Sequence, residues 1–216
     1  MLQLSVRVTN HLKKSRFVAA LFVGLVCSLG ACSHKPQLDL SDEAEWREGD
    51  LALRLGWGME SRAVTANGRS AYSHIGLLHF DSVQAEWQVV HAVPGEGLPE
   101  YLKCEPVKAF FSPERASHGA WIRLKCNDSI ARNAVQYALG KVAQKIEFDN
   151  DYLLEDTTQL YCTELVWQSF LHQGLDVTGG KRQFVPSIFS KEGKCIFPSD
   201  IEESETSLFV KPLKTK

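Results

Sequence analysis

One cysteine and two histidines of this chain have the types and spacing that thiol-dependent catalysis requires. Such catalysis needs a thiol nucleophile, a base that takes its proton, and a third group that orients the base. Cys162 lies in the run Tyr161-Cys162-Thr163-Glu164-Leu165, directly ahead of apolar residues with helical spacing. A helix N-terminus offers unpaired backbone N–H groups and a dipole that favour a thiolate. The sequence therefore indicates Cys162 as the candidate nucleophile.

His74 and His91 fall on two neighbouring segments that are rich in β-forming residues. Residues 72–80 and 86–93 flank a turn signal, a pattern that predicts an antiparallel hairpin. With the turn placed at 81–85, His74 is expected to lie opposite His91 or the residue after it. Directly opposed Cβ atoms are about 4.5–5.5 Å apart, so two imidazoles can share a hydrogen bond. His74 is therefore the candidate base, and His91 is the candidate group that orients it.

The rest of the sequence predicts an α+β domain around this hairpin. Two further strands are expected at 51–55 and 120–126, where β-forming residues follow turn-forming ones. Two amphipathic helices are expected, one beginning near Asp128 and one over about 161–173. Residues 98–119 contain three prolines and are therefore expected to form a loop with short helical pieces.

The first 31 residues predict an export signal. They hold four of the 24 Lys and Arg residues of the chain and none of its 26 Asp and Glu residues. An apolar run, Phe17–Leu29, follows the last of these basic residues and leads into small residues, as in secretory signals. The run is too short and too interrupted to be a good membrane-spanning helix. A buried N-terminal core helix is the alternative.

The end of this segment resembles the lipobox of bacterial lipoproteins. Its residues are Leu29-Gly30-Ala31-Cys32. The resemblance implies cleavage before Cys32, whose thiol and new amine then carry acyl chains such as palmitate. Two or more chains give a stable membrane anchor. Because Ser33 follows the cysteine, similarity to Gram-negative sorting signals implies the outer membrane, facing the periplasm.

The expected organisation of the chain follows from this cleavage. Residues 1–31 form the signal, residues 32–47 the lipidated cysteine and a polar tether, and residues 48–216 the folded domain. Without the signal the formal charge is −6, from 20 Lys and Arg against 26 Asp and Glu. No basic tract remains, so nucleic acid is not an expected partner. The anchor, and not a cationic surface, is expected to hold the protein to the membrane.

The remaining cysteines allow more than one arrangement. Cys104, Cys126, Cys162 and Cys195 would lie in a compartment that permits disulfides. Four cysteines allow two bridges, or one bridge and a working thiol. No Cys-x-x-Cys motif is present, so the sequence does not assign the pairing.

Three motifs, taken in order, resemble those of a known superfamily. They are Gly49-Asp50-Leu51 at a strand start, Ser73-His74-Ile75-Gly76-Leu77 in the hairpin, and Tyr161–Trp167 at the start of a late helix. Their order is similar to that of the permuted papain-fold hydrolases of the NlpC-like superfamily, the YiiX/YebB group. The resemblance extends over about Gly49–Gly174. It implies a circularly permuted papain-like fold, in which an antiparallel sheet packs against the helix that bears the nucleophilic cysteine.

The resemblance also implies roles for individual residues. It places the general base at His74, the nucleophile at Cys162 and the third position at His91, where many relatives have Glu. It implies no cofactor and no metal. A neutral His91 can accept a hydrogen bond from His74 as a glutamate would, but it stabilises an imidazolium less.

The expected activity is therefore thiol-dependent hydrolysis of an amide, with peptidoglycan stem peptides as the nearest polymer in the predicted location. A lipid deacylase or acyltransferase would use the same residues, and an apolar groove beside Cys162 would favour that alternative. A non-catalytic envelope lipoprotein is a third reading. The residue types alone also allow a three-ligand zinc site at His74, His91 and Cys162. The substrate and the oligomeric state are not assigned by the sequence.

Overall fold

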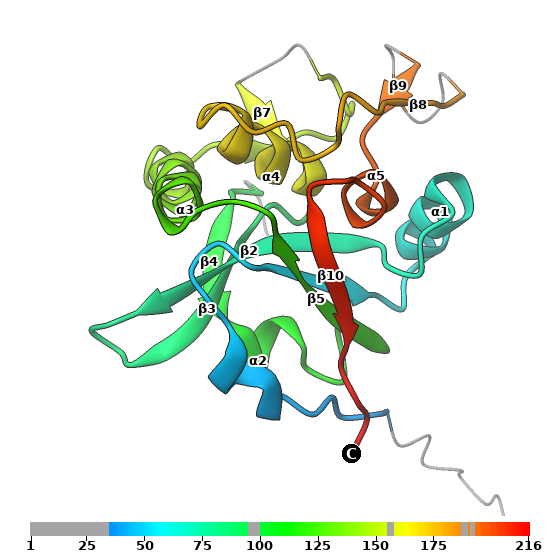
Figure 1. The fold of residues 1–216 in the computed structure, drawn as a ribbon. Coiled ribbons are helices and arrows are strands. Elements are labelled where there is room, and N and C mark those ends of the chain that lie inside the picture. Colours follow the sequence, from blue (N-terminus) through cyan, green and yellow to red (C-terminus); the bar gives the residue numbers. More distant parts are fainter. Residues whose placement is uncertain (1–34, 95–99, 155–157, 187–189, 191–192) are drawn as a thin grey trace, which may run out of the picture. The chain divides into compact units, whose positions relative to one another are not determined.

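A six-stranded antiparallel sheet forms the centre of the described part of the protein (Figure 1). The structure is a computed structural model that describes residues 35–94, 100–154, 158–186, 190 and 193–216, so the predicted signal and Cys32 lie outside it. The strands follow the order β10-β5-β1-β2-β3-β4 across the sheet. Their bounds are β1 Leu51–Leu55, β2 His74–Asp81, β3 Glu86–His91, β4 Lys103–Pro106, β5 His118–Leu124 and β10 Ser207–Pro212.

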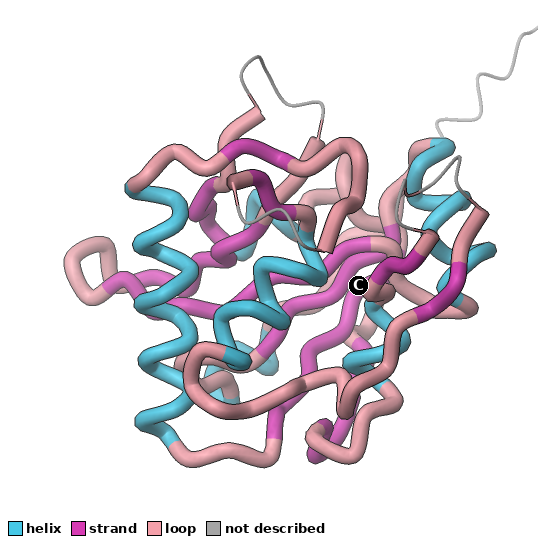
Figure 2. The backbone as a smooth tube through the Cα atoms, turned by 90° about the horizontal axis from the view of Figure 1, so that it is seen from above, coloured by secondary structure: helices cyan, strands magenta, loops and turns pink. Residues whose placement is uncertain are grey.

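Helices and two small two-stranded ribbons lie around this sheet. The helices are η1 Ser41–Glu45 (3-10), α1 Met59–Gly68, α2 Val107–Phe110, α3 Asp128–Ala143, α4 Cys162–Leu171 and α5 Pro198–Glu202. The ribbons pair β6 Glu147–Phe148 with β7 Gln159–Leu160, and β8 Gln183–Phe184 with β9 Lys194–Cys195. Figure 2 shows α3 and α4 side by side in front of the strands. The predicted α+β class is confirmed.

One face of the sheet packs against α3 and α4. Successive side chains of a strand point to opposite faces, so Leu51 and Leu53 of β1 share a face with their partners Leu77 and Ile75 of β2. All four are fully buried. The helices contribute apolar side chains at helical spacing to the same cluster: Ala134, Val135, Ala138, Leu165, Val166 and Phe170. This cluster fixes the position of α4, the helix that begins at Cys162.

The opposite face is covered by α2 and by the segment that precedes β1. Leu38 and Trp46 of this segment are buried and pack with Trp121 and Phe110 in a second apolar cluster. Leu38 also forms a β-bridge with Thr215 near the C-terminus. The prediction of a tether over residues 32–47 is therefore wrong for the part of this segment that the structure describes. Apolar side chains bind this segment to the domain, which begins well before residue 48.

The hairpin of β2 and β3 forms with a shorter turn than the sequence predicts. Leu77 pairs with Val90, and Asp81 pairs with Glu86, so only residues 82–85 form the loop. Ala85 closes it in the left-handed region at φ 54°, and the Asp81 side chain accepts backbone hydrogen bonds from the loop. The predicted register was wrong by one or two residues, because the turn residues could not be counted from composition.

This register places His91 beside Gly76, so His74 and His91 are diagonal rather than directly opposed. They still share one face, because His91 lies beside Gly76, and Gly76 and His74 are two residues apart on β2. Two strands of the sheet, β4 and β10, lie in parts of the sequence where no strand was expected. β4 lies within the proline-containing stretch 98–119, and β10 lies near the C-terminus.

Candidate active site

Cys162 is the first residue of α4, as predicted. The preceding Tyr161 is extended and buried, and its hydroxyl accepts a hydrogen bond from Ile196 N at 3.0 Å. Thr163 Oγ1 donates to Ile196 O at 2.6 Å. Residues on both sides of Cys162 are thus bonded to one point of the chain, which holds the start of the helix in place.

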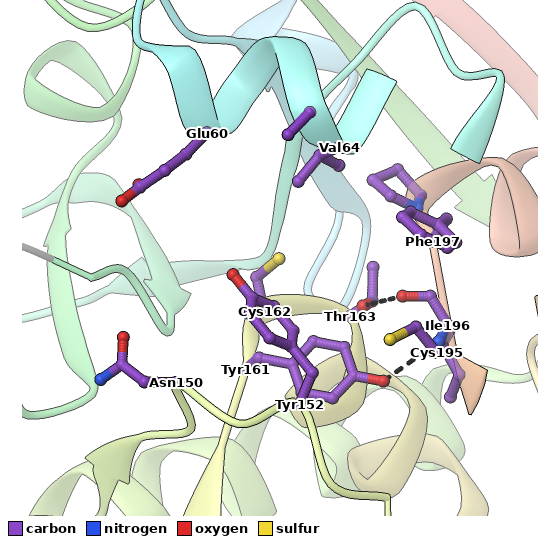
Figure 3. Close-up of a pocket in the computed structure, with 12 residues that line it drawn as sticks. Glu60, Val64, Asn150, Tyr152, Tyr161, Cys162, Thr163, Cys195, Ile196 and Phe197 are labelled. Carbon is purple, nitrogen blue, oxygen red and sulfur yellow. Dashed lines mark hydrogen bonds between the residues drawn. The ribbon is translucent and has the colours of Figure 1, made fainter. Parts of the chain in front are cut away.

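Cys162 lies between two hollows of the protein. The first, of about 290 Å³, is bounded by α1 and by the segment from Cys195 to Pro198. Its lining is largely apolar, and Figure 3 shows Cys162 Sγ pointing into the space below Val64. We call it the apolar hollow; its apolar lining residues are Ala63, Val64, Tyr152, Tyr161, Ile196, Phe197 and Pro198.

The second hollow, of about 480 Å³, contains His74 and Arg54 and also reaches Cys162. We call it the polar hollow. Tyr152 and Val64 line both hollows. A bound molecule can therefore extend from one hollow to the other across the Cys162 thiol.

His74 and His91 form the hydrogen-bonded pair that the sequence predicts. His74 Nε2 lies 2.8 Å from His91 Nδ1, and both rings are buried. The diagonal pair meets because Gly76 has no side chain: a Cβ there would lie 2.8 Å from His91 Cβ. Phe110 packs against both rings, with centroid distances of 5.6 Å to His74 and 5.1 Å to His91. The orientation of the candidate base is thus set by packing as well as by the hydrogen bond.

A fourth group that the sequence prediction missed extends this pair. Glu105 Oε1 of β4 lies 3.1 Å from His91 Nε2. Arg115 Nη1 donates to both carboxylate oxygens of Glu105, at 2.9 and 2.7 Å, and Lys103 Nζ lies 3.2 Å from Oε2. The sequence did carry a signal for it: Lys103 and Glu105 are two residues apart and therefore share one face of a short strand. The nearby prolines made this stretch look like a loop.

Cys162 and His74 line the same hollow but are not hydrogen-bonded to each other among the described contacts. In unliganded enzymes such hydrogen bonds are often long and shorten only when substrate binds. The structure thus brings His74 and His91 into direct contact. It places Cys162 at the polar hollow, which His74 also lines.

Burial raises the pKa of the Cys162 thiol to about 11. The backbone N–H groups of Ile75, Thr163 and Cys162 itself act in the opposite direction, as does the charge of Arg54, but they do not outweigh burial. The thiolate that the helix N-terminus was expected to favour is therefore not the resting form. At neutral pH Cys162 carries its proton and needs a base to remove it.

Both histidines are neutral at neutral pH. Burial, followed by the charge of Arg54, holds the pKa of His74 well below 6.5. Burial also lowers the pKa of His91 to about 4, although the hydrogen bond to Glu105 acts against this. His74 is therefore available as a base, and His91 as a neutral hydrogen-bonding partner.

Because both histidines are neutral in the folded protein, we predict that the protein loses stability as the pH is lowered from about 6.5 towards 4. Unfolded histidine titrates near 6.5, whereas folded His91 stays neutral to about pH 4, so the unfolded state binds more protons in this window. The free energy of unfolding should fall by up to about 1.4 kcal/mol per pH unit for each such group. Urea unfolding at pH 7, 6 and 5 measures this slope.

Two variants test whether this pH dependence of stability comes from the buried histidines. His91→Gln should reduce the slope, and His118→Gln should not, because that side chain is exposed in the folded protein. An unfolding free energy that stays constant from pH 7 to 5 would contradict neutral, buried histidines.

Cys104, Cys126, Cys162 and Cys195 are not joined by disulfides. The Cys104 thiol donates to Gln88 Oε1 at 2.8 Å, and Cys195 lines the apolar hollow. The sequence left the pairing open. In the structure the candidate nucleophile carries a thiol and is not committed to a bridge.

Comparisons of the whole chain with known proteins identify a fold. The sequence matches no protein-family model and no curated protein. Among solved structures, it resembles the crystal structure of YiiX from Escherichia coli O157:H7, with a TM-score of 0.60 and 16% sequence identity, over 84% of this chain and 98% of that one. The chain has the YiiX fold. At this identity the YiiX likeness shows the fold alone, and YiiX is itself described only as a metalloprotein of DUF1105.

Because YiiX is described as a metalloprotein, it matters whether residues of this chain are arranged to bind a metal ion. Within the described residues, no group of three or more His, Cys, Asp and Glu side chains is arranged to hold a metal ion. The reason at the candidate site is geometric: His91 uses Nδ1 for His74 and Nε2 for Glu105. As arranged here, His74, His91 and Cys162 do not fit the three-ligand zinc site that their types allow.

No helix in the described ranges has both the length and the apolar character needed to cross a bilayer.

Proposed function

We propose that this protein is a thiol-dependent acyl hydrolase with a permuted papain-like arrangement of its site. Cys162 is the nucleophile, His74 the general base and His91 the group that orients His74. The observation that supports this most is that one hollow is lined by a helix-terminal thiol and by His74, which is hydrogen-bonded to His91. A lone cysteine or histidine would be a weaker argument, because each is more often a structural residue.

The proposed reaction follows from the protonation states. As Cys162 Sγ bonds to the substrate carbonyl carbon, its proton moves to His74 and the carbonyl oxygen becomes an oxyanion. Backbone N–H groups at the start of α4 stabilise that oxyanion. Collapse expels the amine or alcohol, which takes the proton from His74. Water, deprotonated by His74, then hydrolyses the thioester, releasing the carboxylic acid and restoring the thiol.

The apolar hollow favours an acyl chain as the group that Cys162 removes. Its volume of about 290 Å³ and its aromatic and aliphatic lining suit the burial of hydrocarbon. The polar hollow on the other side of Cys162 carries Arg54 and Arg115 and suits a polar leaving group. A lipid-derived ester or amide therefore fits the two hollows better than a cell-wall peptide, the substrate first expected from location.

The proposed anchor is consistent with a membrane substrate. Lys35 Nζ lies 5.7 Å from the ring centroid of Trp57, a residue of the polar hollow. Cys32 precedes Lys35 by three residues, a span of at most about 11 Å. Trp57 is 44% and Met59 76% exposed at the same hollow, and Trp is typical of membrane interfaces. A lipid on Cys32 would thus keep this opening close to the outer-membrane surface.

The anchor is tested by feeding an alkyne-tagged palmitate to Gram-negative cells that express the full chain. The tag should appear on the wild-type protein and be absent from Cys32→Ser. Tagging that persists in this variant would overturn the lipid anchor.

The substrate class is tested by presenting both candidates to the full chain in detergent. One arm contains phosphatidylethanolamine micelles and measures released fatty acid, and the other contains muropeptides and measures new amines. We expect release of fatty acid by the wild-type protein and none by Cys162→Ala. Cleavage of muropeptides alone would overturn the acyl assignment but keep the thiol mechanism. Activity that survives in the variant would overturn both.

A further inference from the structure

We propose that Glu105 is a positioning residue that fixes the proton positions on both histidines, so that His74 presents a bare Nδ1 to the thiol. The inference deepens the proposed function and rests on it for its catalytic meaning. It adds a carboxylate, from a strand that the sequence did not predict, to the pair of His74 and His91.

The first step concerns the charge of Glu105. Burial alone would raise the pKa of its carboxyl, but the hydrogen bonds from His91 and Arg115 and the charge of Lys103 hold that pKa well below the usual range. Arg54 Nη1 adds a third cation at 4.0 Å. Glu105 is therefore ionised at neutral pH. An ionised carboxylate accepts hydrogen bonds and cannot donate one.

The second step follows the protons inward from Glu105. Because Glu105 only accepts, the proton of neutral His91 must lie on Nε2, 3.1 Å from Oε1. His91 Nδ1 is then unprotonated and accepts from His74 Nε2 at 2.8 Å. His74 is neutral as well, so with its proton on Nε2 its Nδ1 carries a lone pair. The opposite order of protons would require a carboxylate that donates.

The third step concerns catalysis. When His74 takes the thiol proton on Nδ1, the hydrogen bonds from His74 to His91 and from His91 to Glu105 keep their directions, so no rearrangement is needed. The carboxylate also supplies, through His91, negative charge that stabilises the imidazolium. His91 therefore does not weaken the site as the sequence suggested. The carboxylate that many relatives place on the second strand of the hairpin comes here from β4 and acts through one intervening ring.

Glu105→Gln is the decisive substitution because it preserves size and reverses the order of protons. Arg115 Nη1 lies closer to Oε2 than to Oε1, at 2.7 against 2.9 Å, and Lys103 Nζ lies 3.2 Å from Oε2, so the Gln carbonyl oxygen should occupy the Oε2 position and turn the NH₂ group towards His91. His91 must then accept at Nε2 and donate from Nδ1. His74 Nδ1 consequently carries a proton and is lost as a base.

The direct measurement is long-range ¹H–¹⁵N NMR of the histidine rings, made at pH 7 on the full chain in detergent. We expect the Nε2–H form of both His74 and His91 in the wild-type protein. In Glu105→Gln we expect the Nδ1–H form of both. Glu105→Asp keeps an acceptor-only carboxylate and should retain the wild-type forms. Nε2–H signals that persist in Glu105→Gln, or Nδ1–H signals in the wild-type protein, would overturn the inference.

Kinetics provide the second readout. Glu105→Gln should lower kcat by about 10²- to 10⁴-fold, the effect of a wrongly protonated base, with little change in KM. Glu105→Asp should recover part of this loss, which a general structural defect would not allow. A wild-type kcat in Glu105→Gln would overturn the inference. If the wild-type protein hydrolyses no substrate, the proposed function fails, while the NMR spectra still decide the proton positions.

Discussion

Replacing Cys162 with alanine is expected to lower the rate of acyl hydrolysis by at least about 10³-fold while the protein stays folded. In the proposed mechanism the thiol forms the bond to the substrate carbonyl, and no neighbouring group occupies its position at the start of α4. The side chain lines two hollows instead of filling a closed core, so its loss leaves no new sealed cavity. The measurement is kcat/KM of the purified full chain, together with its thermal midpoint.

Cys126→Ala is the matched control for this substitution. Cys126 is also partly buried, but it follows β5 and lies outside both hollows. It should keep the wild-type rate. A comparable loss in both variants would indicate a general effect of removing a cysteine, and an active Cys162→Ala protein would contradict its role as nucleophile.

Gly76→Ala is expected to destabilise the protein by about 1–3 kcal/mol and to lower its activity at the same time. An added Cβ would lie 2.5 Å from Val89 Cγ1, 2.8 Å from His91 Cβ and 2.8 Å from Val90 O. One of these atoms is backbone, so β3 must move away from β2. That movement separates His91 from His74, whose hydrogen bond is 2.8 Å long. Urea unfolding and kcat measure the two effects.

Gly140→Ala is the control for the Gly76 prediction. Gly140 lies within α3, where an added Cβ meets no atom within 4 Å. Alanine is favoured over glycine inside a helix, so this variant should be as stable as the wild-type protein or slightly more stable. It should also keep full activity. If Gly76→Ala behaved in the same way, close packing of the hairpin would not be what sets the histidine pair.

The elements that carry the candidate catalytic residues were predictable because their signals are local. The hairpin of β2 and β3 follows from two β-rich segments around a turn, and α4 from apolar residues at helical spacing after Tyr161. The shared face of His74 and His91 follows from strand alternation alone. These features survive an error in register, provided that the error is an even number of residues.

The remaining features depend on contacts between distant parts of the chain. Glu105 escaped prediction because β4 has only four residues and lies among prolines, where no local signal separates a strand from a loop. The segment around Leu38 and Trp46 appeared to be a tether because its sequence is polar. Its two buried side chains find their partners on the sheet and beside the C-terminus.

The protonation state of the Cys162 thiol also depends on contacts between distant parts of the chain. The helix N-terminus predicted a stabilised thiolate at Cys162, and the dipole does act in that direction. Burial is the larger effect and raises the pKa to about 11. Burial depends on α1 and on residues after Cys195, which adjoin Cys162 only in the folded protein.

The most direct test of the central claim is labelling of the full chain by an alkyl chloromethyl ketone, an acyl-chain analogue that alkylates an activated thiol without turnover. Peptide mass spectrometry should find one equivalent on Cys162 at pH 7, with labelling strongly slowed in His74→Ala because the resting thiol then has no base. Equal labelling of wild-type and His74→Ala protein, or modification of other cysteines in place of Cys162, would contradict a Cys162 nucleophile activated by His74.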